Sequence, residues 1–177
     1  MYSTKVIVGL GNPEQDYDRT RHNVGFRALD FFCVKYDIKI DLSDKNVDYG
    51  VASISEKEVF VIKPKTYMNL SGSCVKSFTQ YRNIEPSNLL VLHDDIDVKL
   101  GSIRSKIAGG DAGHKGVRDI IEKLGTSDFS RIRIGIGRPD TDIEISDWVL
   151  KRFPPKELEI IDGILEDVAL EAFDFVS

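Results

Sequence analysis

Cysteine is scarce in this sequence, and long apolar runs are absent. Cys33 and Cys74 lie in separate apolar segments without C-x-x-C spacing, which argues against a disulfide framework or a cysteine zinc site and predicts two buried free thiols. No run of 18 apolar residues is present, and no apolar signal-like segment follows Met1. We therefore predict a cytoplasmic protein that does not associate with membranes.

Histidine is also rare, with three residues in 177: His22, His93 and His114. Imidazole is the side chain that gains or loses a proton near neutral pH. A reaction that needs a base at this pH therefore has few candidates. His22 stands out because its T-R-H-N segment follows the G-L-G-N-P segment at 9–13 and directly precedes an apolar stretch with helical spacing.

Basic residues are fewer than acidic residues in the whole sequence, but they are concentrated in one region. The net charge is −5, yet residues 99–138 hold nine Lys and Arg against four Asp and Glu. Residues 139–177 hold three basic and eleven acidic residues. This asymmetry indicates either one side that faces an anionic partner or a solvated basic face without a ligand.

Segments with strand and helix patterns alternate along the chain. Strands are expected at 4–10, 49–54, 59–64, 88–92, 103–107 and 132–136. Helices are expected at 24–36, 71–81, 114–124 and 156–176. This order predicts a single α/β domain over residues 1–177, in which helices cover both faces of a twisted, mostly parallel mixed sheet in three α/β/α layers.

Polar side chains follow several of the expected strands. Asn12 follows the first strand, Asn69 the strand at 59–64 and Asp94 the strand at 88–92. Glycines at 109, 110, 113 and 116 precede a helix, and such a loop can wrap its amides around an anion or an extended substrate. Ligand sites of open α/β sheets lie at the carboxyl ends of the strands. His22 beside Asn12 at this edge indicates a hydrolase.

Two other patterns in the sequence suggest different kinds of site. Gly9-Leu10-Gly11 is similar to a dinucleotide-binding loop, but Glu14 occupies the position of the third glycine, which argues against a nucleotide site. His93, Asp94, Asp95 and Asp97 offer ligands for Mg²⁺ or Mn²⁺. A metal-dependent phosphohydrolase is therefore one alternative, although it would leave His22 without a role.

Taken together, the motifs resemble those of the bacterial peptidyl-tRNA hydrolase family over nearly the whole chain. They are G-L-G-N-P at 9–13, T-R-H-N at 20–23, K-P-x-T-Y-M-N-L-S-G at 63–72, H-D-x-x-D at 93–97, G-H-x-G at 113–116 and R-x-R-I-G-I-G at 131–137. The resemblance implies a single α/β domain that needs no metal or other cofactor. It also implies cleavage of the ester that joins a peptide to the terminal ribose of tRNA.

The resemblance also implies roles for individual residues. His22 would be the general base and Asp94 the carboxylate that orients it. Asn12 and Asn69 would donate hydrogen bonds to substrate carbonyls or to the attacking water. The remaining contacts would come from Tyr17, Tyr67 and Met68 around the substrate and from Arg104, Lys106 and Arg133 on tRNA phosphates. The expected partner is the acceptor stem and 3′ end of peptidyl-tRNA, not DNA or a membrane, and the expected state is a monomer.

The glycine loop departs from the family pattern. The family's G-G-x-G-G-H-N-G is replaced by G-G-D-A-G-H-K-G at 109–116, so Lys115 stands where an asparagine contacts the substrate. Lysine cannot accept a hydrogen bond, but it brings a cation with a longer reach. We expect Lys115 to contact substrate. The same departure leaves open a second alternative, an RNA-binding relative that does not hydrolyse its ligand.

Overall fold

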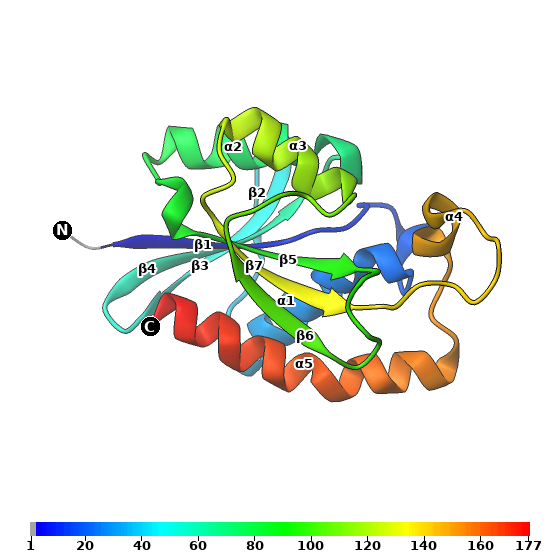
Figure 1. The fold of residues 1–177 in the computed structure, drawn as a ribbon. Coiled ribbons are helices and arrows are strands. Elements are labelled where there is room, and N and C mark those ends of the chain that lie inside the picture. The colour runs from blue at the N-terminus through cyan, green and yellow to red at the C-terminus, as the bar shows by residue number, and fades with distance from the viewer. Residues whose placement is uncertain (1–2) are drawn as a thin grey trace.

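Seven strands of the computed structural model, which describes residues 3–177, form one mixed sheet (Figure 1). Met1 and Tyr2, the first residues of the expected domain, lie outside the described residues. The order across the sheet is β2-β3-β4-β1-β5-β7-β6. In chain order the strands are β1 (Thr4–Gly9), β2 (Leu42–Ser43), β3 (Val47–Ile54), β4 (Lys57–Pro64), β5 (Leu89–Asp95), β6 (Ile103–Ile107) and β7 (Ser130–Gly135).

The sheet is parallel in its centre and antiparallel at its edges. β4, β1, β5 and β7 pair in parallel, whereas β2–β3, β3–β4 and β6–β7 are antiparallel pairs. All seven residues of β5 are buried, as expected for a parallel strand covered on both faces. The predicted α/β fold with a mixed sheet is confirmed.

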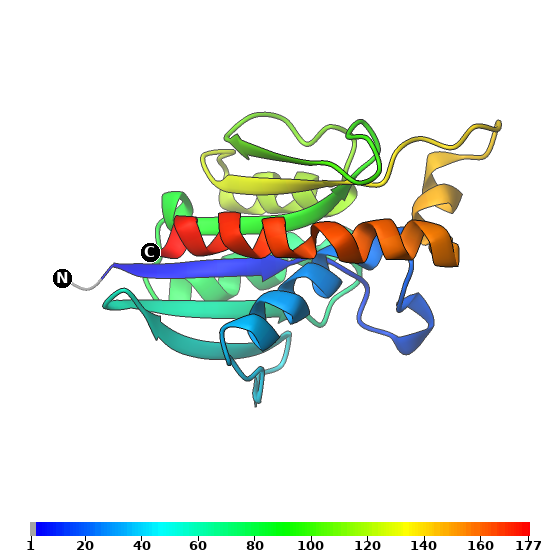
Figure 2. The ribbon, with the colours of Figure 1, turned by 90° about the horizontal axis from the view of Figure 1, so that it is seen from below.

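Helices cover both faces of the sheet (Figures 1 and 2). α1 (Val24–Lys35) and α5 (Pro155–Val176) pack on one face, and α2 (Ser71–Tyr81) and α3 (Lys115–Leu124) pack on the other. Shorter helical segments connect these elements: η1 (Gln15–Tyr17), η2 (Arg21–Asn23), η3 (Met68–Leu70), η4 (Pro86–Asn88) and α4 (Ile145–Leu150).

A close approach between α1 and the sheet positions the start of that helix. A Cβ added at Gly25 would lie 2.3 Å from the backbone oxygen of Leu92, so a larger residue would push α1 away from β5. The amide of Phe26 donates to the carbonyl of Leu10 at 3.2 Å. These contacts hold η2, which directly precedes α1, at the carboxyl ends of β1 and β5.

Most observed elements differ from the expected ones by one or two residues at their ends, and three differences matter for the site or the topology. β5 continues to Asp95, because His93, Asp94 and Asp95 pair in register with β7. α3 begins at Lys115, because His114 is its N-cap residue. β2 and α4 were not expected, since one has two residues and the other six.

The cysteines are buried, as predicted. Cys33 packs on the α1 and α5 side of the sheet and Cys74 on the α2 and α3 side, so they cannot pair. Burial raises the pKa of each thiol to about 12. Both therefore stay protonated and unreactive. Across residues 3–177, every helix is too short or too polar to cross a bilayer.

Candidate active site

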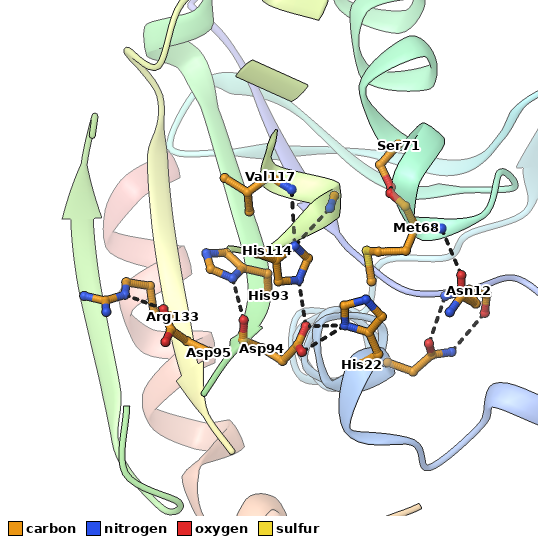
Figure 3. Close-up of polar contacts among 12 residues, drawn as sticks. Asn12, His22, Met68, Ser71, His93, Asp94, Asp95, His114, Val117 and Arg133 are labelled. Atoms are coloured by element: carbon orange, nitrogen blue, oxygen red, sulfur yellow. Dashed lines mark hydrogen bonds and ion pairs between the residues drawn. The ribbon is translucent and has the colours of Figure 1, made fainter. Parts of the chain in front are cut away.

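Two elements far apart in the sequence bring His22 and Asp94 together (Figure 3). His22 lies in η2 and Asp94 near the end of β5. His22 Nδ1 is 2.9 Å from Asp94 Oδ2 and 3.1 Å from Oδ1. Because an ionised carboxylate only accepts hydrogen bonds, Nδ1 carries the proton. The Nε2 lone pair of His22 is then available to a molecule in the adjoining cavity.

His114 is a second imidazole on the same carboxylate. Its Nε2 lies 2.8 Å from Asp94 Oδ1. Its Nδ1 accepts hydrogen bonds from the backbone amides of Gly116 and Val117, at 3.1 and 3.2 Å. An Nδ1 that accepts must be unprotonated, so Nε2 carries the proton and donates to Asp94. His114 therefore caps α3 and holds Asp94 with one side chain.

The electrostatics of this group favour an ionised Asp94. Burial alone would raise the pKa of Asp94, but the interactions with His22 and His114 outweigh it and hold that pKa well below its usual range. Burial and the adjacent His114 lower the pKa of His93 to about 3. The Nδ1 of His93 lies 2.7 Å from the backbone oxygen of Asp94. His93 is thus a packed residue rather than a base.

The amide of Asn12 is oriented by backbone contacts. The backbone amide of Met68 donates to Asn12 Oδ1 at 2.9 Å. The Asn23 side chain brackets the Asn12 backbone, accepting from its amide at 2.8 Å and donating to its carbonyl at 2.9 Å. These bonds leave Asn12 Nδ2 as the donor group that can serve a ligand. Figure 3 shows Asn12 on the η2 side of the site, near His22.

A cavity of about 470 Å³ opens over these residues. His22, Asn12 and Asp94 lie in its wall, and all five residues predicted to contact substrate also line it: Tyr17, Tyr67, Met68, Asn69 and Lys115. Met68 is buried, whereas Asn69 and Lys115 are exposed. A Cβ added at Gly116 would lie 2.6 Å from Met68 Sδ. Glycine at this position lets α3 approach the Met68 side of the cavity.

The basic residues predicted to contact tRNA lie on β6 and β7, and Asp95, the ion-pair partner of Arg133, lines the cavity. Arg104 is the cross-strand neighbour of Arg133, so their side chains share one face of the sheet with Lys106. Arg104 is exposed and Lys106 half-buried. Arg133 Nε donates to Asp95 Oδ2 at 2.8 Å, which offsets part of its charge.

Arg131, on the same strand, has a different role. It is buried and donates to the carbonyl oxygens of Gly110 and Gly109, at 2.5 and 2.6 Å. Asp111 Oδ2 accepts from Arg118 Nε at 3.1 Å. The glycine loop is therefore held from both sides.

The structure does not bring together the four ligands of the metal-dependent alternative. Arg133 pairs with Asp95, and Arg138 pairs with Asp97 at 2.8 Å. In the described chain, the acidic and histidine group compact enough for an ion is instead His22, Asp94 and His114. The protonated Nε2 of His114 cannot be a ligand while its Nδ1 caps α3. The donor set therefore fits a hydrogen-bonded catalytic group better than a metal centre.

Comparison of the chain with known proteins identifies its relatives. Residues 6–177 match the family described as Peptidyl-tRNA hydrolase. The chain is 41% identical over 172 residues to the peptidyl-tRNA hydrolase of an Exiguobacterium species, covering 97% of this chain and 93% of that one. It is 43% identical over 161 residues to the enzyme of that name from Bacillus subtilis, covering 91% and 86%.

The chain belongs to the peptidyl-tRNA hydrolase family. Its structure is also similar to the crystal structure of peptidyl-tRNA hydrolase from Acinetobacter baumannii, with a TM-score of 0.90, 37% identity and coverage of 99% of this chain and 89% of that one. The family resemblance seen in the motifs is confirmed.

Two features of the site were missed from the sequence. No role was predicted for His114, the first residue of the helix expected at 114–124, although a histidine at the start of a helix is a possible N-cap. The wall formed by α4, which contributes Ile145, Ser146, Val149 and Leu150 to the cavity, was missed because this segment is too short to show a helical pattern.

Proposed function

We propose that this chain hydrolyses the ester bond between peptide and tRNA in peptidyl-tRNA, with His22 as the general base. The observation that carries the proposal is the hydrogen bond from His22 Nδ1 to the buried Asp94 carboxylate. It fixes the tautomer that leaves Nε2 free to take a proton. Family membership supports the substrate.

In the proposed reaction, His22 Nε2 removes a proton from a water molecule as that water attacks the ester carbonyl carbon. Asp94 stabilises the imidazolium that forms. Asn12 Nδ2 donates to the oxygen that becomes negatively charged, and Asn69 offers a second amide at the rim. The ester C–O bond then breaks, and His22 returns the proton to the ribose oxygen of tRNA.

The remaining residues would bind the two parts of the substrate. Tyr17, Tyr67 and Met68 form a wall suited to the peptide, and Lys115 adds a cation at the rim. Arg104, Lys106 and Arg133 would contact phosphates of the acceptor stem and 3′ end without reading sequence. We propose that the protein acts as a monomer in the cytoplasm, where translation supplies peptidyl-tRNA.

The test measures release of peptide from purified peptidyl-tRNA in excess EDTA, by wild type and by His22→Ala. We expect cleavage by wild type and a loss of about 10²–10⁴-fold in rate for the variant, since this is what a positioned base contributes. tRNA binding should persist in the variant. Near-normal cleavage by His22→Ala would contradict the mechanism.

The same assay separates the alternatives. Binding of tRNA without any cleavage by wild type would identify the RNA-binding alternative. Cleavage that stops in EDTA and returns with Mg²⁺ or Mn²⁺ would identify a metal-dependent reaction. The His22–Asp94 hydrogen bond argues against both alternatives. An RNA-binding protein has no need of an oriented base, and a metal-dependent reaction would leave His22 without a role.

A further inference from the structure

Arg21, the residue before the proposed base, is buried in a set of contacts that the reaction above does not use. Its side chain is 3% exposed, and Nη2 lies 2.6 Å from Glu157 Oε2. Its guanidinium carbon is 3.5 Å from the ring centroid of Trp148. Nη1 lies 3.4 Å from the carbonyl oxygens of Lys151 and Arg152. One side chain thus joins η2 to α4, to the segment after α4 and to α5.

α4 has few side-chain contacts of its own, although the segment after it is also held by backbone hydrogen bonds, from Arg21 N to the carbonyl of Lys151 at 3.0 Å and from Phe153 N to that of Arg19 at 2.9 Å. The helix spans six residues, Ile145–Leu150, and none of them is fully buried. A helix this short is not stable by itself, so its position depends on tertiary contacts. Trp148 and Val149 pack against the edge of the core, and Trp148 also stacks on Arg21 and donates from Nε1 to the carbonyl of Gly137 at 2.9 Å. Figure 1 shows α4 lying against the segment that precedes α1.

The same helix forms one side of the active-site cavity. Ile145, Val149 and Leu150 are its apolar contributions, and His22 faces the same cavity. Because Arg21 precedes His22 in the chain, the residue that anchors the apolar wall also lies next to the proposed base. The backbone bonds fix the segment after α4, and the side-chain contacts of Arg21 with Trp148 and Glu157 fix how α4 itself lies relative to the base.

We propose that Arg21 is a positioning residue that holds α4 so that its apolar face contacts the peptide side of the substrate next to the ester. The inference rests on the proposed function. It assigns Arg21, Trp148 and Glu157 to selectivity for an apolar residue at the ester, and leaves proton transfer to His22. Lysine cannot replace Arg21 in this role, because it lacks the planar group that stacks and donates in several directions.

The test compares Arg21→Lys with Arg27→Lys. Arg27 also pairs with α5, through Asp162 at 2.7 Å, but lies on α1 and lines no part of this cavity. Kinetics are measured on peptidyl-tRNA whose ester-linked residue is leucine or glycine. For Arg21→Lys we expect KM to rise about tenfold with leucine and less than threefold with glycine, with kcat nearly unchanged, as when uniform binding is lost. Arg27→Lys should behave as wild type.

A second readout does not depend on cleavage. Trp148 is the only tryptophan in the sequence, so intrinsic fluorescence reports on α4. The probe is adenosine that carries N-acetyl-leucine through a 3′ amide, which cannot be cleaved as an ester. We expect it to change the emission of wild type and Arg27→Lys at similar concentrations, and that of Arg21→Lys only at about tenfold higher concentration, corresponding to the loss of one strong contact.

Three outcomes would overturn the inference: an unchanged KM in Arg21→Lys, an equal rise in KM for the leucine and glycine substrates, or equal probe affinity in all three proteins. If Arg21→Lys does not fold, Glu157→Gln removes the charged partner while keeping its shape, and a smaller change in the same direction is expected. A further outcome separates the two proposals. If the probe binds wild type and Arg27→Lys more tightly than Arg21→Lys, as predicted, but wild type cleaves no peptidyl-tRNA, then the proposed function fails while the positioning role of Arg21 stands.

Discussion

The two sides of the active-site cavity are built differently. On one side, the His22, Asp94 and His114 side chains are 10%, 2% and 7% exposed and hydrogen-bonded to one another. On the other, Asn69 and Lys115 are exposed and form no side-chain hydrogen bond or ion pair with any other described residue. The chemical groups are thus fixed before substrate arrives, whereas the binding groups can adapt. Changes on the first side should lower kcat, and changes on the second should alter KM.

Among changes to the residues around His22, Asp94→Asn should give the largest effect. The carboxylate accepts from both His22 and His114, whereas an asparagine offers one oxygen and one NH₂, so one imidazole N–H loses its acceptor. We expect kcat to fall by about 10²-fold or more, as when a catalytic histidine is left in the wrong tautomer. An unchanged rate would show that another group orients His22.

Asp94 also predicts a pH dependence of stability. Its folded pKa lies below its unfolded value, so the ionised carboxylate stabilises the fold above about pH 4 and this contribution is lost as the pH falls further. Urea unfolding of wild type should therefore show a free energy of unfolding that decreases below this pH. Asp94→Asn should show a weaker decrease. Parallel curves for the two proteins would mean that Asp94 does not titrate in this way.

His114→Ala tests whether the second imidazole supports the first. The variant loses both the cap of α3 and one donor to Asp94. We expect unfolding to become easier by about 1 kcal/mol, as for other lost caps, and kcat to fall by about tenfold, corresponding to one charge-assisted hydrogen bond. His114→Asn is the matched control, since asparagine is a good cap but is shorter. It should restore stability but not kcat, and recovery of both would assign His114 to stability alone.

The basic residues of β6 should affect binding of tRNA rather than the chemical step. The double variant Arg104→Ala and Lys106→Ala should raise KM for full-length peptidyl-tRNA by about fivefold and lessen the salt dependence of tRNA binding by about two in slope. A minimal ester of adenosine should be cleaved as before. Alanine at Lys39 and Lys45, near the opposite edge of the sheet, is the matched control. Equal losses on the two substrates would mean that Arg104 and Lys106 have a structural role.

The smallest effect is expected at Lys115. Lys115→Asn replaces a cation with an amide that both donates and accepts. It should strengthen peptide contact and weaken tRNA binding, each by roughly 1 kcal/mol or less. Lys123→Asn, on the same helix but away from the cavity, controls for the loss of charge. KM and kcat on peptidyl-tRNA and on a minimal ester provide the measurement, and a collapse of activity would show that Lys115 is essential.

The sequence was enough to predict which residues meet on the buried side of the site, but not which residues pair with one another around it. His22, Asn12 and Asp94 could be brought to one edge because strand ends meet there in any parallel α/β sheet. The pairing of Arg133 with Asp95 could not be predicted, because it depends on the register between β5 and β7. Asp95 and Arg133 are 38 positions apart, and a shift of one residue would turn one of them to the other face.

His114 and α4 show two further limits of the sequence. Whether a histidine at a helix start caps it or points elsewhere depends on the backbone of the loop before it, which here includes the left-handed Ala112 and Gly113. The position of α4 depends on the stacking of its Trp148 on Arg21, a residue far away in the sequence. Neither this stacking nor the His114 cap produces a periodic pattern of apolar residues that could be recognised in the sequence.

Asp94 sits in β5, a strand with hydrogen-bonded neighbours on both sides and no exposed residue. Amide protons in such a strand exchange with solvent only when the whole domain opens. The exchange rates of the amides of Asp94 and its neighbours should therefore follow the global unfolding equilibrium, while those of α4 should be faster. A molecule of this protein that is still folded has its carboxylate in place, so gradual heating should lower the number of active molecules rather than the activity of each.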